Sequence, residues 1–430
     1  MPREGDGEAR RAAEATARQS YGKLVAFLAH RMRDVAAAED ALAEAFAAAL
    51  IDWPARGVPD HPEAWLLTVA RRKAIDAARR RRHGEDAAGH LRLLADELTA
   101  STASEAEIPD HRLALIFACA HPAIDNNIRA PLILQTVLGF DAAAIGSAFL
   151  VAPATMSQRL VRAKAKIRQA GIPFRVPERA EMRDRIEPVL EAIYATFSEG
   201  WSDPAGTETR RRNLADEAIW LGRLVASMLP DEPEALGLLA LMLFAEARRA
   251  ARRSASGDYV PLAEQDPRRW DARLIDEAEA ALLRASRIGA VGRYQLEAAV
   301  QSAHVVRRRT GSSDWAAIAR LYEALMEMTG SPVVAINRAI AAAEAEGPET
   351  GLALLGVAAE DARLAEYQPY WAARAELLAR IGDLDAAEKA YQLAIGLEAD
   401  PAVRDFLQQR RSTLCRSHLI LTGIASLRSQ

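Results

Sequence analysis

Residues 64–82 read Ala-Trp-Leu-Leu-Thr-Val-Ala-Arg-Arg-Lys-Ala-Ile-Asp-Ala-Ala-Arg-Arg-Arg-Arg, a stretch that combines a helical period with a strong local charge. Leu66, Val69 and Ile75 recur at the spacing of one helix face, which predicts an amphipathic helix packed through its apolar side. From residue 71 to residue 82 there are seven basic residues and one acid, Asp76. Such a helix can neutralise several phosphates, but a solvated basic face explains the charge equally well.

The same apolar period runs through almost all of the 430 residues, so the sequence predicts an all-α protein. Two further buried helix faces are expected upstream of the basic helix, formed by Leu24, Phe27 and Leu28 and by Leu42, Phe46 and Leu50. A loop rich in Pro and Gly is expected at residues 52–62. Trp53 and Trp65 flank the basic helix in sequence, where aromatic rings can stack on unpaired bases or simply fill the core.

A second basic cluster lies at residues 154–168, with five basic residues and no acid. Asp141 can cap a short helix before it, and Pro153 suits the first turn of the next helix, where a missing N–H matters little. This pattern predicts a helix–turn–helix whose second helix would enter the major groove. Early Gln and Arg side chains would read bases, and later Lys and Arg side chains would hold phosphates. A plain helical hairpin is the alternative.

The C-terminal part contains a helix-pair repeat signal. Its positions follow the spacing of a tetratricopeptide-type unit: Trp371, Ala375, Leu378, Gly382, Ala387, Tyr391 and Ala394. Small residues at this spacing let two antiparallel helices approach, while the aromatic rings fill the groove between them. Residues 315–341 repeat the start of the pattern. The spacing favours a repeat-like superhelix, and an ordinary Ala-rich hairpin is the alternative.

The net charge of −4 conceals an uneven distribution along the chain. Residues 1–180 hold 25 Lys and Arg against 22 Asp and Glu, and the remaining residues hold 30 against 37. The two parts are therefore expected to have different partners. Cys119 and Cys415, the two cysteines, fit a reducing compartment. No signal peptide is expected, and Pro and Gly residues break the weakly charged stretch 130–158, which predicts short packed helices and no membrane span.

No catalytic constellation is evident in the sequence. A Gly-rich phosphate loop, a His-Glu-x-x-His motif and paired CxxC motifs are all missing, so we expect neither an enzyme nor a metal or cofactor site. Cys119 and His121 lie two residues apart, but no further pair of ligands is near them in sequence. We interpret them as a buried thiol and a capping imidazole.

Taken together, the N-terminal modules resemble regions 2 and 4 of the extracytoplasmic-function (ECF) sigma factors of bacterial RNA polymerase. Residues 38–46, Ala-Glu-Asp-Ala-Leu-Ala-Glu-Ala-Phe, are similar to the core-binding helix of that family. Residues 64–82 are similar to its minus-ten helix, and the helix–turn–helix is similar to its minus-thirty-five reader. The C-terminal part resembles the tetratricopeptide-like extension that some ECF groups carry.

The resemblance implies a division of the chain and a role for each part. It implies an all-α protein with sigma region 2 at residues 12–83, a linker at 84–110, a helix–turn–helix region 4 at 111–172 and a helical repeat-like regulatory domain at 181–430. Core RNA polymerase and promoter DNA would be its partners in the bacterial cytoplasm, with a further protein or ligand for the C-terminal domain. A stand-alone helix–turn–helix regulator with a repeat-type interaction domain is the competing hypothesis.

The resemblance also implies the residues that make each contact. The polymerase would contact Glu39, Asp40, Glu44 and Phe46. The minus-ten element would contact Trp53, Arg56, His61, Trp65, Arg71, Arg72, Lys73, Arg79 and Arg80. The minus-thirty-five element would contact Thr155, Ser157, Gln158, Arg159, Arg162, Lys164 and Lys166.

Overall fold

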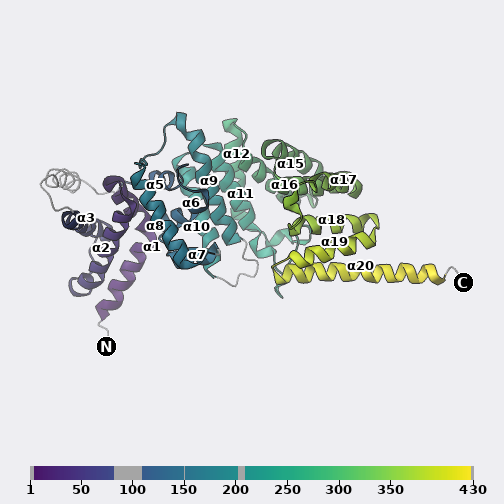
Figure 1. The fold of residues 1–430 in the computed structure, drawn as a ribbon, viewed down its shortest axis with the longest axis horizontal. Coiled ribbons are helices and arrows are strands. Elements are labelled where there is room, and N and C mark those ends of the chain that lie inside the picture. Colours follow the sequence, from purple (N-terminus) through teal and green to yellow (C-terminus); the bar gives the residue numbers. More distant parts are fainter. Residues whose placement is uncertain (1–3, 82–108, 150, 202–208, 428–430) are drawn as a thin grey trace. The chain divides into compact units, whose positions relative to one another are not determined.

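A computed structural model describes residues 4–81, 109–149, 151–201 and 209–427 (Figure 1). Across these ranges every regular element is a helix, apart from one antiparallel bridge between Arg253 and Tyr259. The all-α prediction is thereby confirmed. The chain divides into two compact units, residues 1–228 and residues 229–430. The expected linker at 84–110 lies outside the described residues except for its last two positions.

The first unit is built from helices α1 to α3 and α5 to α10. Their bounds are α1 Glu4–Met32, α2 Val35–Arg56, α3 Pro62–Arg81, α5 Arg112–Cys119, α6 Asn126–Leu138, α7 Ala142–Ala148, α8 Pro153–Gln169, α9 Arg179–Trp201 and α10 Thr209–Met228. Helices α1, α2 and α3 pack on one another, and α1 also packs against α5 and α6.

The core of the α1–α3 bundle follows the predicted apolar faces. Leu24, Phe27 and Leu28 are completely buried, as expected. Asp34 begins α2, because its carboxylate accepts a hydrogen bond from the Ala37 backbone N–H at 3.2 Å. Leu50 is 50% exposed, so its predicted place on the buried face was wrong. The buried stripe of α2 continues instead through small alanines and ends at Trp53.

The predicted loop at residues 52–62 is shorter than expected. Helix α2 continues through Pro54 to Arg56, and only residues 57–61 separate it from α3. Two features account for the difference. The Trp53 ring is buried and anchors the last turn, and the Gly57 N–H then caps the Trp53 carbonyl at 2.9 Å. Gly57 has φ of +85°, which a residue without a side chain adopts easily.

Helices α7 and α8 begin at the predicted signals, and α6 begins with a cap of the same kind that was not predicted. Asp125 caps α6 through the Asn127 N–H, and Asp141 caps α7 through the Ala144 N–H. Pro153 occupies the first turn of α8, as predicted. The turn between α7 and α8 is tight, since a Cβ atom placed on Gly146 would lie 2.6 Å from the Val151 carbonyl oxygen. The stretch 130–158 therefore forms packed helices, and no helix in the described part of the chain is long and apolar enough to cross a membrane.

Helices α9 and α10 belong to the first unit, so the boundary between the two units lies downstream of the boundary expected from the sequence. They pack on each other and against α5, and α9 also packs on α6. Arg185 of α9 donates a hydrogen bond to the Phe117 carbonyl, and the Arg112 guanidinium lies 4.7 Å from the centre of the Trp220 ring of α10. The second compact unit therefore begins at Leu229, whereas the sequence placed the start of a C-terminal domain at residue 181.

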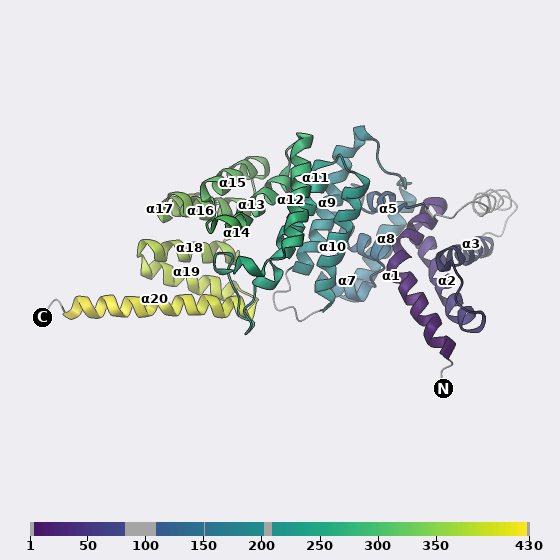
Figure 2. The ribbon, with the colours of Figure 1, turned by 180° about the vertical axis from the view of Figure 1, so that it is seen from behind.

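The second unit is a succession of helical hairpins (Figure 2). Its α-helices are α11 Pro233–Ala247, α12 Ala272–Ile288, α13 Arg293–Val305, α14 Arg307–Thr310, α15 Trp315–Thr329, α16 Pro332–Glu346, α17 Pro348–Ala358, α18 Gln368–Ile381, α19 Leu384–Leu397 and α20 Pro401–Leu427. From α15 to α20 each helix packs against the next one along the chain.

The predicted helix pair at residues 371–394 forms as α18 and α19. Ala375, Ala387 and Ala394 are completely buried at the contact between the two helices. Tyr391 lies among them, and its hydroxyl donates a hydrogen bond to Glu376 at 2.9 Å. Gly382 ends α18 in the left-handed conformation with φ of +84°. Small residues at the contact and a Gly at the turn are thus the features that the spacing predicted.

The contact between α1 and α6 gives the first testable prediction. A Cβ atom on Gly22 would lie 2.0 Å from the Val137 carbonyl oxygen, so Gly22→Ala should destabilise the first unit by about 1–3 kcal/mol. Gly7→Ala lies on the exposed part of the same helix with no atom nearby, and should stabilise α1 by about 0.5–1 kcal/mol. Hydrogen exchange of α1 and α6 peptides measures both effects. Equal protection in the two variants would contradict the close packing.

Candidate nucleic-acid interface

One side of α8 presents polar and cationic side chains to solvent. Met156, Leu160 and Ile167 are buried and attach this helix to the unit. The predicted contact residues that remain exposed are Thr155, Ser157, Gln158, Arg159, Arg162 and Lys166. The amphipathic pattern of α8 therefore separates its packing side from a basic outer side.

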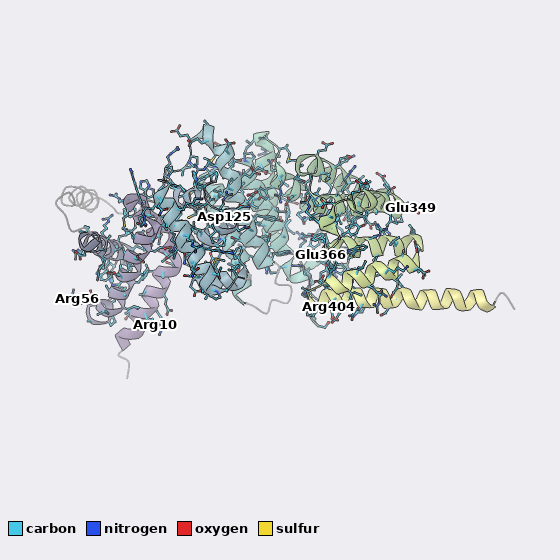
Figure 3. The ribbon with its side chains drawn as sticks, viewed as in Figure 1. Arg10, Arg56, Asp125, Glu349, Glu366 and Arg404 are labelled. Atoms are coloured by element: carbon cyan, nitrogen blue, oxygen red, sulfur yellow. The ribbon has the colours of Figure 1, made fainter. Side chains whose placement is uncertain are left out.

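A hollow of about 340 Å³ lies between α6 and α8. Arg159, Arg162 and Lys166 line it from α8, and Asp125 and Asn127 line it from the start of α6. Asp125 is labelled in Figure 3. Three cations thus gather beside one carboxylate that already caps a helix, which leaves an excess of positive charge facing the hollow.

The basic helix α3 is only partly available to a ligand. Arg72 is exposed and Lys73 is half-buried, with its Nζ atom 3.5 Å from Glu44 Oε2. Arg71 is 7% exposed, and its guanidinium lies 5.1 Å from the centre of the Phe27 ring. A long basic side chain can be buried in this way when its cation makes a cation–π contact with an aromatic ring. In this arrangement Arg71 therefore packs within the bundle. The side chains of Arg79 and Arg80 lie outside the described residues.

The aromatic residues near α3 form an edge-to-face pair. The rings of Trp53 and Trp65 lie 5.5 Å apart at an angle of 65°. Trp53 is 2% exposed and belongs to the core, whereas Trp65 is half-buried. Arg56, labelled in Figure 3, and His61 are exposed around the short loop. Of the two predicted aromatic contacts, only Trp65 is placed where a base could reach it.

The acidic residues of α2 divide into exposed and buried members. Asp40 and Glu44 face solvent, and Phe46 is half-buried. The Glu39 side chain is only 14% exposed, and its carboxylate accepts a hydrogen bond from Lys164 of α8. Burial raises the pKa of Glu39 above its ordinary value, and the charge of Lys164 opposes that increase. The sequence predicted that Lys164 contacts a DNA phosphate, but its ammonium group is paired with Glu39 in the structure.

The contact between α2 and α8 was not expected from the sequence. A second ion pair joins the same two segments, since Arg168 Nη1 lies 3.0 Å from Asp34 Oδ2. His30 of α1 stacks on His111 at 4.1 Å, and burial together with nearby positive charge lowers the pKa of His111. The only sequence signal for this contact is the spacing of Lys164 and Arg168, four residues apart on one helix face, and it does not identify the partner.

Among the residues that the structure describes, no group of three His, Cys, Asp or Glu side chains is placed to hold a metal ion. Cys119 is completely buried, and its thiol lies 3.4 Å from the Thr136 hydroxyl. Burial raises its pKa to about 12, so the thiol stays protonated at neutral pH. His121 Nδ1 accepts a hydrogen bond from the Ala123 N–H at 3.1 Å. The interpretation as a buried thiol and a capping imidazole is confirmed.

Parts of this chain match two protein families, and nearly all of it is similar to one further protein. Residues 17–84 match the family described as sigma-70 region 2, a match that covers the second half of α1 and all of α2 and α3. Residues 185–286 match a family of unknown function, DUF6596, and this match crosses the division between the two units. The chain is also 38% identical over 398 residues to the uncharacterized protein R00370 of Rhizobium meliloti, across 91% of this chain and 92% of that protein.

Proposed function

Because the chain belongs to the same family as R00370 of Rhizobium meliloti and carries a sigma-70 region 2, we propose that it is an RNA polymerase sigma factor of ECF type. The match of residues 17–84 to sigma-70 region 2 carries this proposal. This region is part of sigma factors, which bind core polymerase. The chain would work in the bacterial cytoplasm, where it directs the polymerase to promoters and performs no bond chemistry itself.

Region 2 would contact both the polymerase and the minus-ten element. Asp40 and Glu44 are exposed acids on α2, suited to meet basic groups on the polymerase and to set the register of docking. Trp65, Arg56 and His61 lie at or near the surface around the α2–α3 loop, and Arg72 is exposed farther along α3. A basic surface with an accessible aromatic ring can hold an unstacked base as the promoter melts.

Helices α7 and α8 would form the helix–turn–helix that reads the minus-thirty-five element. Gln158 and Arg159 lie near the start of α8 and are exposed, as side chains that read base edges must be. Arg162 and Lys166 follow on the same helix and would hold phosphates. The exposed face of α8 and the cationic hollow beside it support this assignment.

The second unit would control the activity of the first. Dividing the chain at Met228 leaves 31 basic and 31 acidic residues in the first unit, against 24 and 28 in the second. The acidic excess therefore lies wholly in the helical hairpins, and stacked hairpins of this kind are typical of extended protein-binding surfaces. A tetratricopeptide-like regulatory role for this unit is our proposal.

Transcription in vitro tests the main proposal. Adding the full chain to core polymerase and genomic promoter DNA should produce discrete transcript starts that core polymerase alone does not produce. Mapping the 5′ ends of the transcripts checks this. If the chain binds duplex DNA tightly without polymerase and no new start appears, it is a stand-alone regulator instead.

A chain that ends at Met228 tests the controlling role of the second unit. A cut after Gly171 would remove α9 and α10 from α5 and α6, so the division between units is the better site. We expect promoter output per bound polymerase to change, because the controlling unit is absent. Circular dichroism must first show that the shortened chain keeps its helices. Unchanged output from a folded short chain would mean that the second unit has no controlling role.

Two substitutions on α8 separate base reading from phosphate binding. Arg159→Ala should weaken binding at one base position by about 1–3 kcal/mol and relax specificity there. Lys166→Ala should weaken binding about equally for all sequences and reduce its salt dependence. Binding of the polymerase complex to a set of upstream-element variants at several salt concentrations measures both. A uniform loss with Arg159→Ala would make Arg159 a phosphate contact.

A further inference from the structure

Positively charged and imidazole side chains gather within the second unit, where its first helices end. Arg248 follows the last residue of α11, His304 lies in the last turn of α13, and Arg307 begins α14. The charges of Arg248 and Arg307 both act on His304, and Arg252 adds a further positive charge beside Arg248. The packing of α11 on α13 brings these residues together from distant parts of the sequence. We call these four residues the cationic cluster.

Two guanidinium groups of the cationic cluster bond to uncharged oxygen atoms. Arg248 Nε donates to the Phe244 carbonyl at 3.3 Å, and Arg248 Nη2 donates to Gln301 Oε1. Arg307 donates to three backbone carbonyls of the segment 262–265 at 2.8 to 3.0 Å. Neutral acceptors of this kind fix the orientation of a guanidinium group and leave its positive charge in place.

Carboxylates on the neighbouring elements are paired with other arginine side chains. Three such pairs have a distance of 2.7 Å between nitrogen and oxygen: Glu246 with Arg249, Glu297 with Arg293, and Asp400 with Arg253. The hydroxyl of Tyr322 faces Arg248, but burial raises its pKa to about 12, so it is uncharged at pH 7. The residues that the structure describes therefore give Arg248 and Arg307 no carboxylate partner, although partly buried charges are normally paired.

His304 adds a hydrogen-bond donor to the cationic cluster. The His304 side chain is buried, and burial together with the charges of Arg248 and Arg307 lowers its pKa to about 4. The imidazole is therefore neutral at pH 7 and carries one N–H group. Burial also lowers the pKa of Arg248 to about 10, so this guanidinium group stays charged at pH 7.

Two buried polar atoms beside the cluster have no hydrogen-bond partner among the described residues. They are Trp270 Nε1 and Gln265 Oε1, on side chains that are 3% and 6% exposed. The Arg307 guanidinium lies 5.3 Å from the centre of the Trp270 ring, and it also donates to the Gln265 carbonyl. Because buried polar atoms are normally satisfied, a hydrogen-bonding molecule is expected at this place.

We propose that the cationic cluster binds a small phosphate-bearing molecule, with Arg248, His304 and Arg307 supplying charge and donors and Trp270 Nε1 a further donor. Guanidinium groups form strong, charge-assisted hydrogen bonds with phosphate oxygens. Partial exposure of Arg248 and Arg307 gives such a molecule access to the cluster. The site lies wholly within the second unit, so binding needs neither polymerase nor DNA and does not depend on the sigma assignment.

Titration of the full-length chain with inorganic phosphate tests the proposal. Sodium phosphate should shift the indole N–H signal of Trp270 in the NMR spectrum in a saturable way, because this N–H gains an acceptor. Sodium chloride at the same ionic strength should leave the signal in place. The chain has seven tryptophans, and the spectrum of Trp270→Phe identifies the signal that belongs to Trp270.

Two substitutions test the role of the cluster charge. Arg248→Met removes the charge and keeps a side chain of similar shape, so the affinity for phosphate should fall about tenfold or more, because charge-assisted hydrogen bonds are lost. Arg284→Met makes the same change on an exposed residue of α12 and should keep the affinity of the wild-type chain. Calorimetric titration measures the affinities, and circular dichroism verifies the helix content.

Several outcomes would overturn the proposal. One is a Trp270 signal that does not move with phosphate, or that moves equally with chloride. Another is a folded Arg248→Met chain that binds phosphate as tightly as the wild-type chain. An equal loss of affinity in Arg284→Met would mean that phosphate binds to surface charge in general. If Arg248→Met loses its helix content, the titration of the wild-type chain decides alone.

Discussion

The arrangement of the first unit depends on a close approach between two helix backbones. Gly22 lets α1 reach α6 so closely that no side chain fits between them, because any Cβ atom would overlap the Val137 carbonyl oxygen. Once α1 and α6 are this close, their neighbours are brought together as well: α2 meets α8, and His30 meets His111. The buried ion pair and the stacked imidazoles are consequences of this one steric constraint.

The contact that follows from it is specific without being strongly stabilising. Burial raises the pKa of Glu39, which means that the surroundings disfavour its charge even with Lys164 beside it. Pairs of this kind determine which surfaces can meet, since a partner without the matching charge leaves a buried ion uncompensated. Asp34 and Arg168 add a second pair at a more exposed place, where salt screens the attraction.

The distribution of net charge along the chain depends on where the chain is divided. Divided at residue 180, the chain has a mildly basic first part and an acidic remainder. Divided at Met228, the first unit is neutral overall and the second carries the whole excess of −4. What distinguishes the first unit is local: cations gather on the outer face of α8 and from the middle of α3 onward, while acids gather on α2. Two ion pairs, Glu39–Lys164 and Asp34–Arg168, join α8 to α2 within this unit.

By itself the sequence determined the helical class, the buried face of α1, the cap at Asp141, the α18–α19 hairpin and the exposed polar start of α8. These features depend on residues a few positions apart, so periodicity and capping chemistry predict them. Tertiary structure alone decided that Trp53 and Arg71 are buried, that Lys164 binds Glu39, and that α9 and α10 join the first unit. The physical reason is distance along the chain. Lys164 lies 125 residues from Glu39, and only the packing of α1 on α6 determines which charge each of them meets.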